Sequence, residues 1–472
     1  MADTGALMKK RVLNMAFDGS LTTSQSFRTT KSNMSNKDSE KYQAKVPYTI
    51  PDSWRWVQLK EVTTLLNGRT YKKHELLESG KTPVLRVGNF FTNNHWYYSD
   101  LELDENKYCE NGDLLYAWSA SFGPKIWDGP KVIYHYHIWK VAYFDMVERD
   151  FLYYWFLKDV NDIKSITTGS TMVHVTKGNM ENRLFPLPPL EEQKHIVAKI
   201  EEIFAVIDQI GTKKEEALSI IRNMRQIAIQ NAIMGVLVEQ DETDESASVL
   251  YKKIQAEKEQ MVKEKKIKKE TRLPEIDAEE VPFEIPESWK WVRLKEVVYN
   301  HGQKKPDKTF SYIDIGSIDN KHTSLNAEEK IIEPEDAPSR ARKIVKMGDI
   351  LYSTVRPYLH NTCIIDREFS EEPIASTGFA VMRTHSGLLN KFLFHYLLSS
   401  TFDLFANDTS NATGTAYPAI NDTKLYQAVI PLPPLNEQHY IVEKLDEIMA
   451  ICDQMEAIFD GSSEVCEALK LV

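Results

Sequence analysis

The sequence predicts a mixed α/β protein in which two α/β modules are separated by long helices that pair as an antiparallel coiled coil. Three observations predict this fold class. Four motifs occur twice, in the same order, along the 472 residues. Heptad-spaced apolar residues follow each copy of the last motif, and aromatic and β-branched runs fill the stretches between motifs. At about 150 residues per domain, the length also favours more than one domain.

The internal repeat is read directly from three pairs of strings. The pairs are IPDSWRWVQLKEV from Ile50 and IPESWKWVRLKEV from Ile285, GDLLY from Gly112 and GDILY from Gly348, and FPLPPLEEQ from Phe185 and IPLPPLNEQ from Ile430. Chance matches would not keep this order, so each copy is interpreted as one structural unit. The fourth motif is a Thr-Gly turn that precedes the PLPPL string in both copies.

The two ends of the chain also take part in the repeat. MKKRVLNMAFDGSL from Met8 resembles MRQIAIQNAIMGVL from Met224, near the end of the middle segment. The chain end from Leu435 resembles only the start of that segment, which opens at Leu190. One spacer is therefore whole and the other is split between the two termini. This pattern predicts a pseudo-twofold repeat within one chain.

Long helices are predicted after the prolines that precede Leu190 and Leu435. Apolar residues there alternate in steps of four and three, an a/d seam that ends at Gly235 in the first helix. The seam positions are Ile196, Ile200, Ile203, Ile207, Ile210, Ala217, Ile221, Met224 and Ala228, then Ile441, Leu445, Ile448, Cys452, Met455 and Phe459. The alternative is helices packed on an ordinary core; the seam's length and its lack of proline favour the coiled coil.

The sequence divides into six segments. They are an N-terminal helical segment (1–25) that completes the C-terminal spacer, a first module (46–189), a central spacer (190–238), a charged linker (239–280), a second module (281–434) and the C-terminal spacer (435–472). The linker is acidic and then lysine-rich, which is typical of a solvated helix face; phosphate contact is the alternative. Within each module the Gly-Asp pairs are predicted to be turns that enter strands.

No catalytic or metal constellation is found. The sequence has no glycine-rich phosphate loop, no GxSxG elbow and no HExxH, and its four cysteines are scattered. His135 and His137 have the spacing of one strand face, and we expect them to be structural rather than metal ligands. The net charge of −11 does not exclude DNA, because a binding cleft needs only local positive charge. The lack of a long apolar stretch and of a signal peptide predicts a cytoplasmic protein.

Taken together, the repeated motifs resemble those of type I restriction-modification specificity subunits. The resemblance covers nearly the whole chain. It implies that each module is a target recognition domain reading one half of a bipartite double-stranded DNA target. It implies that the helices opening at Leu190 and Leu435 dock two methyltransferase subunits, with restriction/translocase subunits completing the complex. S-adenosylmethionine, ATP and Mg would then be held by those partners, and this chain would be a non-catalytic subunit of an adenine-N6 methyltransferase and endonuclease complex.

The candidate DNA-binding residues are hydrogen-bond donors and acceptors in polar stretches of the modules. In the first module they are Arg69, Tyr71, Lys72, Lys73, Asn93, Asn94, Ser119, Ser121, Lys125, Thr168, Gly169, Ser170, Thr171 and Lys177. In the second they are Gln303, Lys304, Lys305, Ser353, Thr354, Arg356, Thr413, Gly414, Thr415 and Tyr417. For each, a solvated loop is the alternative. Trp54 and Trp289 are expected to be core anchors rather than base-stacking residues.

Two other classes of function compete with this interpretation. A coiled-coil adaptor or scaffold would use the same helices and modules without binding DNA. A self-sufficient methyltransferase or nuclease would depend on S-adenosylmethionine or a metal, and the missing motifs argue against it. For a DNA reader with this net charge, we expect weak, salt-sensitive binding by the isolated chain and tight binding only in a complex.

Overall fold

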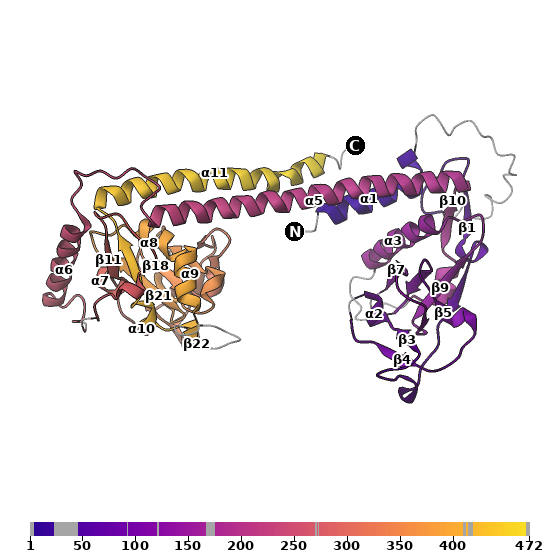
Figure 1. Ribbon diagram of the computed structural model, residues 1–472, viewed down its shortest axis with the longest axis horizontal. Helices are drawn as coiled ribbons and strands as arrows, with labels where there is room; N and C mark the ends of the chain where they lie inside the picture. The colour runs from indigo at the N-terminus through magenta and orange to yellow at the C-terminus, as the bar shows by residue number, and fades with distance from the viewer. Residues whose placement is uncertain are drawn as a thin grey trace. The chain divides into compact units, whose positions relative to one another are not determined.

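The computed structural model describes residues 4–22, 46–91, 93–119, 122–166, 175–269, 271, 273–408, 412–413 and 419–468. The chain divides into two compact units, Met1–Glu215 and Glu216–Val472. Each unit is described by itself (Figure 1). Within the described ranges, no helix has both the length and the apolar character that a membrane crossing requires.

Unit 1 contains a module of short strands covered by helices. Its helices are α1 (Thr4–Asp18), α2 (Val87–Phe91), α3 (Arg149–Ile166), α4 (Lys177–Glu181) and the first part of α5 (Leu190–Ile233). Its strands are β1 (Arg55–Gln58), β2 (Thr63–Asn67), β3 (Thr82–Leu85), β4 (Tyr97–Ser99), β5 (Tyr108–Cys109), β6 (Leu114–Ala117), β7 (Gly123–Ile126), β8 (Val132–Tyr134), β9 (Ile138–Tyr143) and β10 (Leu184–Leu187).

Unit 2 contains the second module. Its helices are the rest of α5, α6 (Ala247–Lys263), α7 (Leu294–Val297), α8 (Asn390–Leu397), α9 (Ser400–Asn407), α10 (Asp422–Leu425) and α11 (Leu435–Ala468). Its strands are β11 (Lys290–Arg293), β12 (Val298–Tyr299), β13 (Phe310–Ile313), β14 (Ile318–Asp319), β15 (Ser324–Leu325), β16 (Lys330–Ile332), β17 (Ala341–Ile344), β18 (Ile350–Ser353), β19 (Thr362–Ile364), β20 (Glu372–Ser376), β21 (Phe379–Thr384), β22 (Ala412–Thr413), β23 (Ala419–Ile420) and β24 (Val429–Leu432).

Both modules use the same sheet plan. Unit 1 has one sheet in the order β2-β9-β6-β7 and another in the order β4-β3-β8-β5, with β1 paired to β10. Unit 2 repeats this as β12-β21-β18-β19 and β16-β13-β20-β17, with β11 paired to β24. In each unit the second sheet has one parallel pair, β3 with β8 and β13 with β20. The predicted mixed α/β class with an internal repeat is confirmed.

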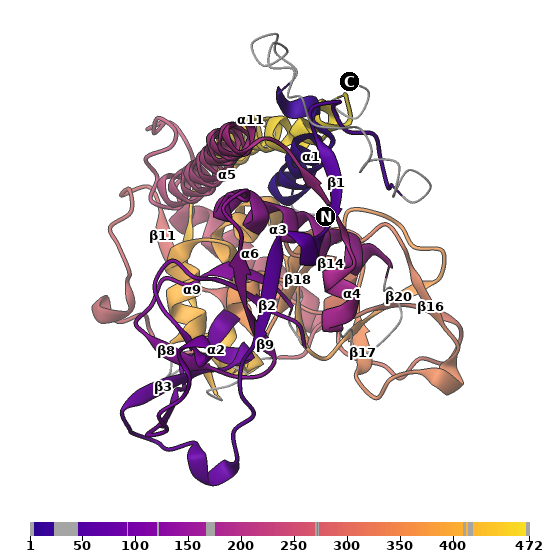
Figure 2. The same ribbon diagram turned by 90° about the vertical axis from the view of Figure 1, so that its right-hand side faces the viewer.

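The long helices begin where the sequence predicts. Helix α5 runs from Leu190 for 44 residues, and α11 begins at Leu435. In unit 1, α1 lies beside α5, and Lys9 of α1 contacts Asp208 of α5 at 2.6 Å (Figures 1 and 2). In unit 2, α11 runs alongside α5 in the opposite direction, and Arg225 contacts Asp453 at 2.7 Å. The heptad positions Ile210 and Met224 are exposed, so the seam is not buried along its whole length and the coiled coil stays a prediction.

Helix α1 and the end of α5 bury matching positions of the repeat, while the assignment of the N-terminal segment to the C-terminal spacer stays a prediction. In α1 the buried residues are Val12, Leu13, Ala16 and Phe17. Their counterparts in the repeat, near the end of α5, are the buried residues Ala228, Ile229, Ala232 and Ile233. Each set packs into the core of its own unit, together with the tryptophan of the IP-[DE]-S-W motif. Trp54 and Trp289 are both 5% exposed, so their assignment as core anchors is confirmed.

A glycine closes each of these helices against the module. Gly19 and Gly235 have φ values of +83° and +74°. A Cβ on Gly19 would lie 2.4 Å from Pro51, and a Cβ on Gly235 would lie 2.5 Å from Pro286. Each proline belongs to the IP-[DE]-S-W motif of the same unit. Only glycine combines the left-handed conformation with this close approach.

We therefore expect Gly235→Ala to lower the free energy of unfolding of unit 2 by about 2 kcal/mol, since it adds both backbone strain and a clash. Gly211→Ala is the matched control, because nothing lies within 4 Å of the Cβ position of this glycine inside α5. The control should stabilise by roughly 0.5–1 kcal/mol. Urea unfolding monitored by hydrogen exchange measures both effects, with unit 2 peptides reporting Gly235→Ala and unit 1 peptides reporting Gly211→Ala. Equal stabilities for the two variants would contradict the proposed helix end.

Helix α6 lies in the segment predicted to be a charged linker. Rather than being solvated all round, it buries Ala247, Leu250 and Ile254 in the core of unit 2. The lysine run continues past its end at Lys263, so the predicted helix face for those lysines is wrong. The α6 residues lie against Gly387, where an added Cβ would meet Ile254 at 2.8 Å.

Candidate nucleic-acid interface

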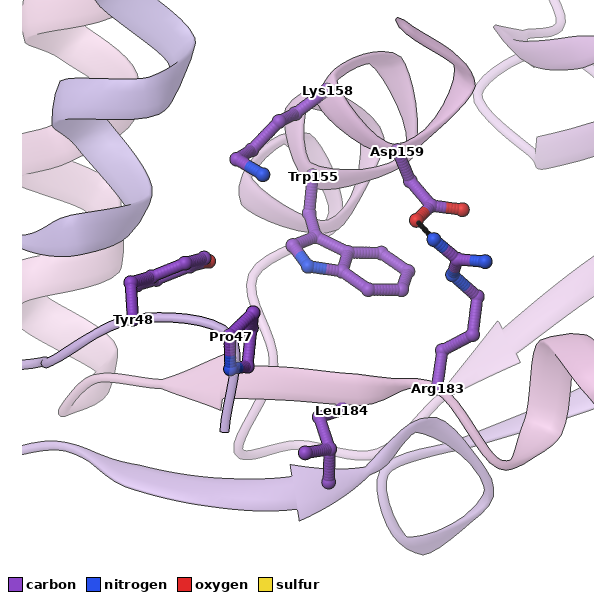
Figure 3. Close-up of a pocket in the computed structure, with 7 residues that line it drawn as sticks. All are labelled: Pro47, Tyr48, Trp155, Lys158, Asp159, Arg183 and Leu184. Carbon is purple, nitrogen blue, oxygen red and sulfur yellow. Dashed lines mark ion pairs between the residues drawn. The ribbon is translucent and has the colours of Figure 1, made fainter. Parts of the chain in front are cut away.

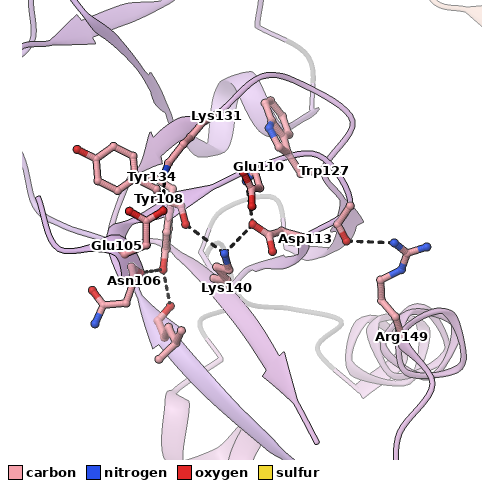
Figure 4. Close-up of polar contacts among 12 residues, drawn as sticks. Glu105, Asn106, Tyr108, Glu110, Asp113, Trp127, Lys131, Tyr134, Lys140 and Arg149 are labelled. Atoms are coloured by element: carbon pink, nitrogen blue, oxygen red, sulfur yellow. Dashed lines mark hydrogen bonds and ion pairs between the residues drawn. The ribbon is translucent and has the colours of Figure 1, made fainter. Parts of the chain in front are cut away.

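The two Gly-Asp turns hold the start of a fully buried strand in each unit. In unit 1 the Asp113 carboxylate accepts the Glu110 backbone N–H at 2.8 Å and pairs with Lys140 at 2.7 Å (Figure 4). In unit 2 the Asp349 carboxylate accepts the Lys346 N–H at 2.7 Å and pairs with Arg383. Strands β6 and β18 begin directly after these turns. The prediction that they are turns entering strands is confirmed.

Beyond β18 the chain forms a loop over residues 354–360 that contains the candidates Thr354 and Arg356. Ser353 and Thr354 are buried, and their hydroxyls donate to the carbonyls of Val355 and Gly378 at 2.8 and 3.0 Å. These two side chains therefore hold the loop rather than face solvent. Arg356 is half-buried and has a left-handed backbone, with φ of 50°. It opens the short 3₁₀ helix η10 (Pro357–Leu359).

The corresponding loop of unit 1 follows β6. Its indole donor, Trp118 Nε1–H, bonds to the Tyr136 carbonyl at 2.9 Å, and Ser119 is buried. In the YHYH string, Tyr134 ends β8 and residues 135–137 lie between β8 and β9, so the expected strand face for His135 and His137 is wrong. The alternation of histidine with tyrosine in this string is therefore found in a turn and not along a strand. Burial, followed by the charges of His137 and Arg86, lowers the pKa of His135 to about 4.

Several cations chosen from the sequence are engaged in ion pairs inside their own unit. The Arg69 guanidinium makes two bonds to Glu75, at 2.8 and 3.1 Å, and its donors hold the pKa of that carboxyl at about 2. Lys304 contacts Glu372 at 2.7 Å and Asp307 at 3.1 Å. Such cations reach a phosphate only by exchanging one partner for another.

The remaining candidates differ in their exposure and in their contacts. Exposed residues are Lys72, Lys73, Asn93, Asn94, Gln303 and Lys305. Tyr71 is buried, whereas Lys125 contacts Asp128 at 3.5 Å and Lys177 donates to the Leu65 carbonyl at 2.9 Å. Outside the described residues lie Ser121, Thr168, Gly169, Ser170, Thr171, Gly414, Thr415 and Tyr417. Thr413 is described only as backbone, in β22. Leu190 and Leu435 are half-buried at the first positions of their helices.

Comparison with known proteins now identifies the family. Residues 51–219 and 286–458 match the type I restriction modification DNA specificity domain, one copy in each module. The chain belongs to this specificity family. It is 26% identical to the type I restriction enzyme EcoAI specificity subunit of Escherichia coli over 89% of this chain and 81% of that protein. The EcoBI subunit of the same organism is 22% identical over 86% and 82%.

The fold agrees with that of a solved relative. A chain from a structure concerned with complex assembly and conformational transition of the type I R-M system superposes with a TM-score of 0.60. It is 22% identical and the match covers 90% of this chain and 96% of that one. The curated relatives of this family are specificity subunits, which favours the DNA-reading interpretation over the adaptor.

One hollow in this specificity-family chain lies apart from the candidate loops. It has a volume of about 410 Å³ and is lined by Pro47, Tyr48, Trp155, Lys158, Asp159, Arg183 and Leu184 (Figure 3). Its cations are engaged, because Arg183 pairs with Asp159 and the Lys158 ammonium lies 5.3 Å from the centre of the Tyr48 ring. Among the described residues, no three His, Cys, Asp or Glu side chains group as metal ligands.

Three residues in or near the second loop were missed by sequence reasoning. His360 ends the turn of η10, and its Nε2 lies 2.7 Å from an Asp403 carboxylate oxygen. The two residues are 43 positions apart, with no local pattern that links them. Tyr358, at the tip of the same loop, is 51% exposed. The only sequence signal was the polar and aromatic composition of RPYLHN after the GDILY strand.

Proposed function

We propose that this chain is the sequence-reading subunit of a type I restriction-modification complex, and that each unit reads one half of a bipartite DNA target. The observation that carries the proposal is a scaffold built twice with different reading loops. In both Gly-Asp turns the aspartate carboxylate accepts the backbone N–H three residues before it, and the strands that follow hold the same place in their sheets. The segments after these strands, residues 118–122 and 354–360, differ in length and sequence. A shared frame with divergent loops suits recognition of two different half-sites.

The energetics favour two readers over one. Each correct base pair contributes about 1–3 kcal/mol of discrimination, and one small module covers only a few pairs. Two modules joined by a stiff element multiply their selectivities. Helix α5 has 44 residues, which corresponds to roughly 65 Å of continuous helix. We propose that this helix fixes the gap between the half-sites.

We further propose that methyltransferase subunits dock on the long helices, and that restriction/translocase subunits join them. Supporting this, Ile220 and Ile227 of α5 and Ile451 and Ile458 of α11 are exposed. Apolar side chains that gather on exposed helix surfaces are typical of protein interfaces. The partners would hold S-adenosylmethionine, ATP and Mg and carry out adenine-N6 methylation and cleavage. This chain would then contribute recognition without catalysis.

Mapping of methylated adenines tests the proposal. The chain would be co-expressed with its methyltransferase partner, and host DNA would be sequenced by a long-read method that detects N6-methyladenine. We expect one motif of two specific parts with a fixed gap between them. A single compact motif or a palindrome would mean that only one unit reads DNA. A stable complex with an active partner but no methylation would instead support the adaptor.

A further inference from the structure

The reading loop of unit 2 has a strained backbone on both sides of η10. Arg356 has φ 50° and ψ 62°, and His360 has φ 50° and ψ 39°. Neither residue is glycine, and left-handed conformations are unfavourable for other L-amino acids. Such a conformation persists only where surrounding contacts hold it, and it is often found at binding sites. The contacts that hold this loop are therefore informative.

The C-terminal side of the loop is tied to α9. His360 Nε2 lies 2.9 and 2.7 Å from the two carboxylate oxygens of Asp403. Helix α9 is itself fixed, because Phe402 and Ala406 are buried and the Ser399 hydroxyl caps its first turn at 3.1 Å. The Leu359 carbonyl also accepts a bond from Asn320 at 3.1 Å.

The N-terminal side of the loop is tied to the sheet. The Thr354 backbone N–H donates to the Gly378 carbonyl at 2.9 Å, and the Thr354 carbonyl accepts the Ile420 N–H at 2.9 Å. Between these two anchors the loop presents Arg356 and the exposed Tyr358. The His360–Asp403 ion pair joins the loop to a separate helix.

We propose that His360 and Asp403 position Arg356 and Tyr358 to read the second half of the DNA target. The proposal rests on the proposed function. The guanidinium group of an arginine can recognise a base or a phosphate through two parallel hydrogen bonds, which requires that its position be fixed. A tyrosine adds a rigid side chain that ends in a polar hydroxyl. A loop held in place before binding loses less entropy when DNA arrives. His360 and Asp403 are thus positioning residues for specificity, and they do not themselves need to touch DNA.

The first unit provides an internal control. Its loop, residues 118–122, is shorter and is tied differently, by the Trp118 indole bonded to the Tyr136 carbonyl at 2.9 Å. The sequence of this loop, WSASF, contains no histidine that could take the part of His360. Loss of the pair in unit 2 should therefore affect one half-site and leave the other unchanged.

The test uses the full chain assembled with its methyltransferase. His360→Gly removes the tie and tolerates the left-handed backbone, so the fold should survive; Asp403→Ala removes the tie from the other side. Methylation rates are measured on the cognate duplex and on duplexes with single-base changes in either half. We expect discrimination in the second half to fall on the order of tenfold, the worth of one good base contact. Discrimination in the first half should stay within about twofold.

The controls separate positioning from a purely structural role. Leu404→Ala changes an exposed neighbour of Asp403 on α9 and should leave both halves unchanged. The double variant should be no worse than either single variant, because the two residues act as one unit. Should His360→Gly fail to assemble, Asp403→Asn, which keeps the side-chain volume, decides the question. Equal losses in both halves, or no loss in the second, overturn the proposal. A wild-type complex without a two-part motif would instead refute the proposed function.

Discussion

Replacing Asp349 with alanine is expected to lower the free energy of unfolding of unit 2 by about 3–5 kcal/mol. The Asp349 side chain is fully buried, and it accepts from the Arg383 Nε–H at 2.6 Å and from the Lys346 N–H at 2.7 Å. Its Oδ1 also lies 3.2 Å from His301 Nε2. Removing the carboxylate leaves a guanidinium and a backbone donor without their shared acceptor, and the large cost comes from those groups.

The equivalent change in unit 1 provides the comparison. The Asp113 side chain is 22% exposed and its partner Lys140 is 24% exposed, so water can replace part of the lost interaction. We expect Asp113→Ala to cost roughly 1–2 kcal/mol, less than its counterpart. Pulse proteolysis in urea, with fragments assigned to each unit, measures both variants. A loss for Asp113→Ala as large as that for Asp349→Ala would mean that burial does not control the strength of these turns.

Much of the fold was predictable because the repeated motifs contain prolines and glycines at positions where the backbone allows few other residues. Pro188 and Pro189 cannot donate, so the strand must end and a helix can begin at Leu190. Glycine occurs at both Gly19 and Gly235 because each ends a helix where a proline side chain leaves no room for a Cβ atom. These are local constraints, and local constraints can be read from sequence. The equivalence of α1 with the end of α5 followed from them.

The reading surface was less predictable because its charges are paired by tertiary structure. Lys304 and Arg69 are the residue types that contact DNA, yet both are paired with carboxylates. The partner of Lys304, Glu372, lies 68 positions away, whereas the partner of Arg69, Glu75, lies six positions away in a turn. Nothing in the sequence around His360 indicates that Asp403 will face it. The α6 helix was hidden for another reason, since its narrow apolar stripe lies within a strongly charged segment.

Replacing the glutamine of the PLPPL-[EN]-EQ motif is expected to lower the free energy of unfolding about as much as replacing Asp349. Gln438 is fully buried; its amide donates to the Gly387 and Pro433 carbonyls, each at 3.0 Å, and accepts the Leu389 N–H at 2.8 Å. It thus ties the start of α11 to the turn after β21. Gln438→Leu leaves these three backbone groups unpaired in the core, so we expect a loss of about 3–5 kcal/mol in unit 2.

Gln193 makes the same three bonds in unit 1, to the Met146 and Pro188 carbonyls and from the Glu148 N–H, at 2.8–2.9 Å. Gln193→Leu should therefore destabilise unit 1 by a similar amount and leave unit 2 unchanged, when hydrogen exchange is followed separately in each. Gln260→Leu, at an exposed glutamine of α6, should change stability by less than about 0.5 kcal/mol. If either buried variant destabilised both units equally, the glutamines would be acting through the whole chain. A loss confined to one unit would mean that the motif recurs because each module needs its own tie between strand and long helix.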